Sequence, residues 1–230
     1  INNSFFSIYL VRCKEKGGIM EDLLNFLFRW GHILFGITWI GLLYYFNFVQ
    51  TEYVKEADDA AKKDVMSKLA PNALWWFRWA AFFTFLTGLV LLHFITIRIT
   101  LDIILGATMG TFMMLNVWGI IWPNQKVVIG IKEGDVAISG PKAALASRTN
   151  TLFSVAMLYF MVSSAHYPHG GFLMQGTMSG TAFIAGLGLI LAIEANAIWG
   201  KMWSFMASVR GVIASSFVLT IVLSSIAYYL

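Results

Sequence analysis

The sequence predicts an all-α fold, a polytopic membrane helix bundle with about six transmembrane helices and outward-facing termini. Of the 230 residues, 58% are hydrophobic and only 12% are charged, whereas soluble domains carry roughly 25% charged residues. The mean hydropathy is +0.72. The apolar residues group into stretches near the roughly 20 residues that a helix needs to cross a bilayer. Because backbone groups in lipid must satisfy their own hydrogen bonds, such stretches predict helices.

The apolar stretches divide the chain into spans and connections. Residues 1–22 are expected to form an N-terminal leader or extension, and residues 23–230 a single transmembrane helical domain. The turn between the second and third spans is very short and lies near Arg98. We expect the six spans at residues 23–49, 73–97, 99–122, 149–167, 178–199 and 207–230.

Two longer connections have a composition of their own. Residues 50–72 are rich in charged side chains and are expected to form a short surface helix that ends at Pro71. Residues 123–148 start at Pro123 and contain several glycines with β-branched residues between them. This composition favours a small hairpin followed by a helix.

Basic residues gather in the connections on one side of the predicted membrane. The positive-inside rule places that side in the cytoplasm, so both termini face outward. We therefore expect a multi-pass protein of the bacterial inner (cytoplasmic) membrane, embedded in the lipid bilayer, with its outer face in the periplasm. The net charge of +4 reflects these connections and does not indicate a nucleic acid partner. The basic residues on that side are Lys55, Lys62, Lys63, Lys68, Lys126, Lys132, Lys142, Arg148 and Lys201.

Four histidines fall in the outer half of the predicted bundle: His32, His93, His166 and His169. An ionisable imidazole in hydrocarbon is costly without a partner and therefore marks a functional site. Histidine nitrogen is a common axial ligand of haem iron, and Cys13, the only cysteine, excludes a covalently attached c-type haem. We predict haem b as the cofactor and these four histidines as candidate ligands.

The ligand set stays open at this point. His32, His93 and His166 are also candidate ligands for a metal ion. The favoured axial pairs are His32 with His93 and His32 with His166. The alternative for each histidine is that it caps a helix or hydrogen-bonds to a backbone carbonyl.

Three further polar side chains lie within or beside the predicted spans. Asp102 opens the third span and is a candidate to orient a histidine ligand, or else to pair with Arg98. Glu194 lies in the fifth span, where it is a candidate proton relay or a hydrogen-bond partner of Asn116 in the third span. Buried carboxylates of this kind are usually protonated or paired.

Several stretches resemble a known family. They are RWGHILFGITWIG at 29–41, WWFRW at 75–79, NVWGIIWPNQK at 116–126 and SRTNTLFS at 147–154. These stretches are similar to the membrane domain of the bacterial cytochrome c-type urate oxidase family, over most of residues 23–169. The first span also resembles the histidine-bearing first helix of membrane protoporphyrinogen oxidases, whose members bind haem b. Full-length members of the urate oxidase family carry a cytochrome c domain after the membrane part, and the expected outward C-terminus agrees with where such a domain would sit.

Three functions agree with these observations. The first is electron transfer by an integral membrane b-type haem protein, to or from a separate cytochrome c or a larger respiratory or photosynthetic membrane complex. The second is oxidation of urate or another small reductant, with a separate cytochrome c as the acceptor. The third is a cofactor-free accessory subunit of a larger membrane complex. No catalytic residue is assigned from the sequence.

Overall fold

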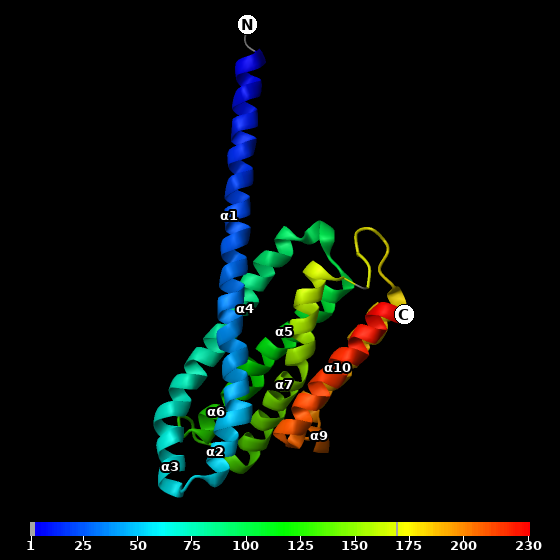
Figure 1. Cartoon of the computed structure of the whole chain (residues 1–230). Helices are drawn as coiled ribbons and strands as arrows, with labels where there is room; N and C mark the ends of the chain where they lie inside the picture. Colours follow the sequence, from blue (N-terminus) through cyan, green and yellow to red (C-terminus); the bar gives the residue numbers. More distant parts are fainter. Residues whose placement is uncertain (1–2, 169) are drawn as a thin grey trace.

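The structure is a computed structural model that describes the backbone of residues 3–168 and 170–230, and the side chains of residues 18–168 and 170–230. Long helices in alternating directions dominate the described part of the chain (Figure 1). They are α1 (Asn3–Tyr44), α4 (Ala70–Phe94), α5 (Leu101–Asn116), α7 (Val136–His166), α8 (Gly180–Trp199) and α10 (Val209–Tyr229). The shorter helical segments are η1 (Tyr45–Gln50), α2 (Thr51–Glu56), α3 (Asp59–Asp64), η2 (Val65–Leu69), η3 (Thr96–Arg98), η4 (Val117–Ile121), α6 (Trp122–Val128) and α9 (Ser204–Ala207).

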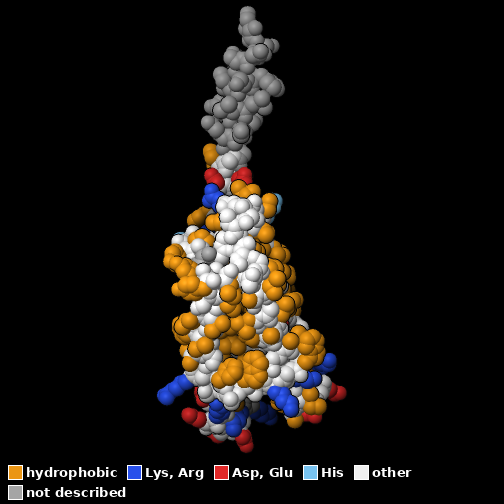
Figure 2. Space-filling view, turned by 90° about the vertical axis from the view of Figure 1, so that its right-hand side faces the viewer, with side chains coloured by type: hydrophobic (Ala, Val, Ile, Leu, Met, Phe, Trp, Pro, Cys, Tyr) orange, Lys and Arg blue, Asp and Glu red, His pale blue; other side chains and the backbone are white. Residues whose placement is uncertain are grey.

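Five helical segments in the described part are long and apolar enough to cross a membrane. They identify a multi-pass membrane protein, and Figure 2 shows its hydrophobic side chains along the body and charged ones toward the two ends, above all the lower end. Of the six helices expected to span the membrane, α7 is not among the five that length and hydropathy identify. The five segments are Gly18–Glu56, Asp59–Phe94, Leu101–Val128, Gly180–Trp199 and Val209–Tyr229.

Helix α7 occupies the centre of the bundle, which explains its composition. It packs against α5 and α10 most extensively, and also against α1, α6 and α8. A helix surrounded by protein can carry polar groups that a lipid-facing helix cannot, because its neighbours supply hydrogen bonds. Its buried polar and charged residues are Ser139, Arg148, Thr149, Asn150, Thr151, Ser154 and Ser163.

The connections divide between two ends of the molecule. The start of α1, the turn between α4 and α5 and the C-terminus lie toward the upper end in Figure 1, which we call the outer end. Segments α2, α3, α6 and α9 lie toward the lower end, which we call the inner end. The tight turn predicted near Arg98 is confirmed as η3. Which end faces the cytoplasm stays a prediction from the basic residues.

Two prolines do not end their helices, contrary to the sequence prediction. Pro71 lies in the first turn of α4 and Pro123 in the first turn of α6. Each follows a π-helical segment, η2 and η4 respectively, so the helical path continues. Proline lacks an N–H group and its ring clashes with the carbonyl four residues back. The wider π turn changes the hydrogen-bonding register just before the ring, which lets the chain pass through both prolines.

The hairpin predicted within 123–148 is also wrong. The chain makes a turn over residues 129–135, where Gly130 has a positive φ of 77°. Asp135 then caps α7 by accepting a hydrogen bond from the Ala137 N–H at 2.8 Å. Within the described residues, β pairing is limited to an isolated antiparallel bridge between Thr100 and Phe172.

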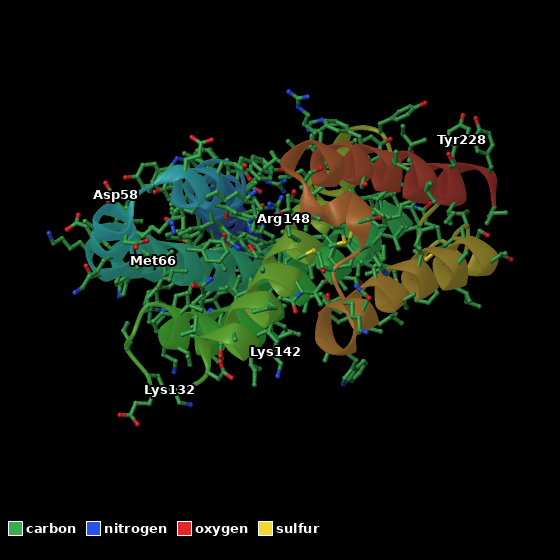
Figure 3. The ribbon with its side chains drawn as sticks, turned by 90° about the horizontal axis from the view of Figure 1, so that it is seen from below. Asp58, Met66, Lys132, Lys142, Arg148 and Tyr228 are labelled. Carbon is green, nitrogen blue, oxygen red and sulfur yellow. The ribbon has the colours of Figure 1, made fainter. Side chains whose placement is uncertain are left out.

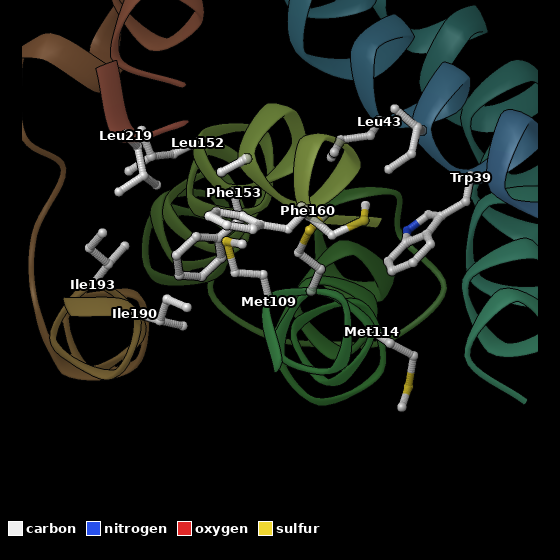
Figure 4. Close-up of a cluster of buried hydrophobic side chains, with 14 of the residues drawn as sticks. Trp39, Leu43, Met109, Met114, Leu152, Phe153, Phe160, Ile190, Ile193 and Leu219 are labelled. Atoms are coloured by element: carbon white, nitrogen blue, oxygen red, sulfur yellow. The ribbon is translucent and has the colours of Figure 1, made fainter. Parts of the chain in front are cut away.

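A hydrophobic core joins the helices around α7. Figure 4 shows Met109 of α5 beside Phe153 and Phe160 of α7, all of them fully buried. A Cβ atom at Gly106 would lie 3.2 Å from the Phe160 Cβ and 3.3 Å from the Met161 backbone nitrogen. The glycine thus permits a close approach of α5 to α7.

Candidate functional site

His32 is held at the contact between α1 and α4. Its Nδ1 lies 2.9 Å from the Thr84 carbonyl oxygen and 3.2 Å from the Thr87 Oγ1. A carbonyl oxygen only accepts, so Nδ1 carries the proton and donates it. The Thr87 hydroxyl in turn donates to the Phe83 carbonyl at 2.6 Å, which leaves its oxygen free to accept from His32.

This arrangement leaves the other ring nitrogen of His32 available. With the proton on Nδ1, Nε2 carries a lone pair. Nε2 is not enclosed, and it has no hydrogen-bond partner among the described residues. A Cβ atom at Gly88 would lie 3.1 Å from the His32 Cε1, so the glycine gives the ring room to lie against α4. His32 is therefore an oriented imidazole whose Nε2 lone pair is free, the form in which histidine binds a metal.

His93 lies on the same helix as Thr84 but on another side. Nine residues separate the two positions, and at 3.6 residues per turn this is about two and a half turns. His93 therefore projects from the side of α4 opposite to the one that meets His32, and its side chain is exposed. The structure does not bring the side chains of His32 and His93 together.

His166 ends α7 at the outer end and is exposed. The Tyr44 hydroxyl lies 2.9 Å from the Ser154 Oγ, which fixes the level of α1 against α7. His32 and His166 each lie twelve residues, about 18 Å, outward of this contact. They share a depth, but Figure 1 shows α7 leaning away from α1 toward the outer end.

The remaining predicted ligand, His169, lies outside the described residues. Within residues 18–168 and 170–230, no group of three or more His, Cys, Asp or Glu side chains is arranged to hold a metal ion. A histidine-only metal centre built from His32, His93 and His166 is therefore not assembled in this part of the chain.

Asp102 ties the outer ends of three segments together. Its side chain is fully buried, and it accepts hydrogen bonds from the Ser163 hydroxyl at 2.7 Å and from the Gly170 N–H at 3.4 Å. The predicted ion pair with Arg98 is not among the ion pairs of the described residues, and the Arg98 side chain is exposed. Asp102 thus links the start of α5 to the end of α7 and to the loop that follows it.

Glu194 forms part of a buried polar network across three helices. The Asn116 side-chain N–H groups donate to the Glu194 Oε2 at 3.1 Å and to the Asn150 Oδ1 at 3.0 Å. Asn150 in turn donates to the Met113 carbonyl at 2.9 Å. The hydrogen bond between Glu194 and Asn116 that the sequence suggested is therefore formed. Buried layers of methionine and phenylalanine separate this network from Asp102.

Several residues in and around these sites were not predicted from the sequence to have a role there. Thr84 orients His32 through its backbone, which no side-chain pattern reveals. Asn150 was detectable, since it is an amide in a predicted span, as Asn116 is. Arg148 is 6% exposed, and its Nη1 is enclosed without a hydrogen-bond partner in the described structure. Figure 3 places it at the inner end, among the helices rather than at the rim.

Comparison with known proteins gives one relationship. Residues 100–193 match the family model described as urate oxidase N-terminal. No curated protein and no solved structure gives a significant match. The match includes the stretches at 116–126 and 147–154 that carried the predicted resemblance, whereas His32 and the stretches at 29–41 and 75–79 lie outside it. The resemblance is thus confirmed for the central part of the chain, where residues 100–193 match this family model.

Proposed function

We propose that this membrane protein transfers electrons through a haem b whose axial ligand is His32, near the outer end of the bundle. The observation that carries the proposal is the orientation of the His32 ring. Its Nδ1 donates to the Thr84 carbonyl, which leaves Nε2 free toward the surface of the α1–α4 pair. An electron-transfer partner would be a separate cytochrome c or a larger membrane complex on the outer side.

The chain's residues fit such a group as follows. The Thr84 carbonyl fixes the tautomer and makes Nε2 a stronger donor to iron. Gly88 lets the ring lie against α4, and the threonines keep it from rotating. Haem, when bound, takes up and releases single electrons at a potential set by its ligands and burial. His93 would not share this haem, so a second ligand would come from His166 or from a partner chain.

The test is the reduced-minus-oxidised optical spectrum of the purified protein with a pyridine haemochrome assay. His32→Ala is compared with His93→Ala, a matched control that removes an imidazole from the opposite side of α4. We expect a b-type α-band in the wild type and in His93→Ala, and its loss in His32→Ala. A haem that is retained in His32→Ala contradicts the proposal. A colourless wild-type protein after haem-replete expression favours a cofactor-free accessory subunit.

A second candidate function is oxidation of urate or another small reductant, with a separate cytochrome c as acceptor. The match of residues 100–193 to the urate oxidase N-terminal family supports it. The discriminating measurement is reduction of added cytochrome c by the purified protein with urate as the reductant. Urate-dependent reduction favours the enzyme, whereas reduction that needs only a pre-reduced protein favours electron transfer alone.

A further inference from the structure

Two cationic side chains share one indole ring at the inner end of the bundle. The guanidinium carbon of Arg78, on α4, lies 3.8 Å from the centre of the Trp122 ring, and the Lys126 Nζ lies 5.6 Å from the same centre. Trp118 completes the group by donating from its indole nitrogen to the Arg78 carbonyl at 3.1 Å. We call Arg78, Trp118, Trp122 and Lys126 the Arg78 cluster.

The Arg78 cluster lacks an anion. The ion pairs among the described residues are Lys55 with Glu52, Lys62 with Asp59 and Lys68 with Asp64, so neither cation of the cluster takes part in one. The Arg78 Nη1 is enclosed without a hydrogen-bond partner in the described structure. The remaining N–H groups of Arg78 and the Lys126 ammonium are not enclosed, which leaves them accessible to a ligand.

The position of the cluster narrows the choice of ligand. Trp122 lies 21 residues, about 31 Å, along the helical path from Leu101 at the outer end. This length matches the roughly 30 Å of a hydrocarbon core, so the cluster lies at the inner boundary of the bilayer. Trp75 and Trp76, which precede Arg78 on α4, are 45% and 56% exposed. Exposed tryptophans of this kind mark the level of lipid headgroups.

We propose that the Arg78 cluster binds the phosphate group of an anionic phospholipid in the inner leaflet. Arginine offers a planar fork of donors that matches phosphate oxygens, and lysine adds a mobile second charge. Trp122 holds both cations by its ring face. The exposed tryptophans of α4 supply an apolar flank for the acyl chains. A free phosphate anion has the same recognition chemistry, so the test must separate the two sources.

The experiment measures lipid binding to the full chain in detergent by native mass spectrometry. The probes are phosphatidylglycerol, phosphatidylcholine and inorganic phosphate. The variant Arg78→Gln with Lys126→Gln is compared with Lys132→Gln plus Lys142→Gln, which removes the same charge from exposed positions near the same end (Figure 3). Each basic residue near an anionic surface contributes about fivefold, so we expect phosphatidylglycerol binding to fall about 30-fold in the first variant only.

The outcomes separate the alternatives. Wild-type preference for phosphatidylglycerol over phosphatidylcholine, lost only in the Arg78–Lys126 variant, supports a lipid site. Equal competition by inorganic phosphate assigns the site to a soluble phosphate instead. Unchanged binding in that variant, or an equal loss in the control, overturns the proposal. If the double variant does not fold, Lys126→Gln alone tests the same point, with about a fivefold loss expected.

Discussion

The polar groups at the α1–α4 contact and those in the α5–α7–α8 centre differ in how completely they are hydrogen-bonded. At the α1–α4 contact, His32 uses one ring nitrogen to anchor itself and leaves the other free. In the centre, Asn116 donates to two acceptors at once and Asn150 continues the chain of bonds to Met113. A ring nitrogen without a hydrogen-bond partner can bind a ligand, whereas both Asn116 N–H groups already form hydrogen bonds that hold helices together. The difference assigns ligand chemistry to His32 and a structural role to Asn116.

The largest effect expected on folding follows from removing Asn116. Asn116→Leu takes the donor from Glu194 and from Asn150 in one step, and a buried acceptor without its donor costs about 1–3 kcal/mol. We expect the free energy of unfolding to fall by about 2–4 kcal/mol, measured by thermal or denaturant unfolding in detergent. Glu194→Gln keeps an acceptor for Asn116 and should change stability by less than about 1 kcal/mol. An Asn116→Leu protein as stable as the wild type contradicts the structural role.

A smaller effect on the same centre comes from the close approach of α5 to α7. Alanine favours a helix over glycine by about 1 kcal/mol, but a Cβ at Gly106 meets Phe160 and Met161 at 3.2–3.3 Å. At Gly110 the nearest atoms lie at 3.8 Å. Gly106→Ala should therefore be less stable than Gly110→Ala by about 1–2 kcal/mol in the same unfolding assay. The reverse order would show that the two helices are not in tight contact at Gly106.

The smallest expected effect concerns Thr87, at the α1–α4 contact. Thr87→Val removes the weaker acceptor of the His32 Nδ1, and the Thr84 carbonyl still holds the ring. We expect haem affinity to fall by no more than about tenfold, with little change in stability. Thr96→Val is the matched control, since its hydroxyl bonds within its own turn, to the His93 carbonyl at 2.7 Å. A titration of haem into both variants measures the difference, and equal affinities would remove Thr87 from the site.

Much of the fold was readable from hydropathy alone. Long apolar stretches predicted the helices, and the short spacing near Arg98 predicted the turn. The helical paths through Pro71 and Pro123 were not readable, because they depend on π turns that precede each ring. Helix α7 was readable as a helix, but its polar residues make sense only once its neighbours are known to surround it.

The sequence predicted how deep the candidate histidines lie in the bundle, but not from which side of its helix each one projects. Counting residues along each span placed His32 and His93 in the outer half of the bundle. Counting did not reveal that His93 projects from the far side of α4, because this needs the residues on α4 that meet His32. Once Thr84 is known to be that contact, the separation of nine residues excludes a shared ligand position.

The most direct test of the role of His32 as a haem ligand is to remove its imidazole and to restore haem binding with free imidazole. His32→Gly removes the imidazole and leaves room beside Gly88 for a free one. We expect that this variant purifies without haem, that added imidazole restores the b-type spectrum, and that His93→Gly keeps the wild-type haem content without imidazole. A His32→Gly protein with wild-type haem content, or a wild-type protein that binds no haem, would contradict the assignment of His32 as the haem ligand.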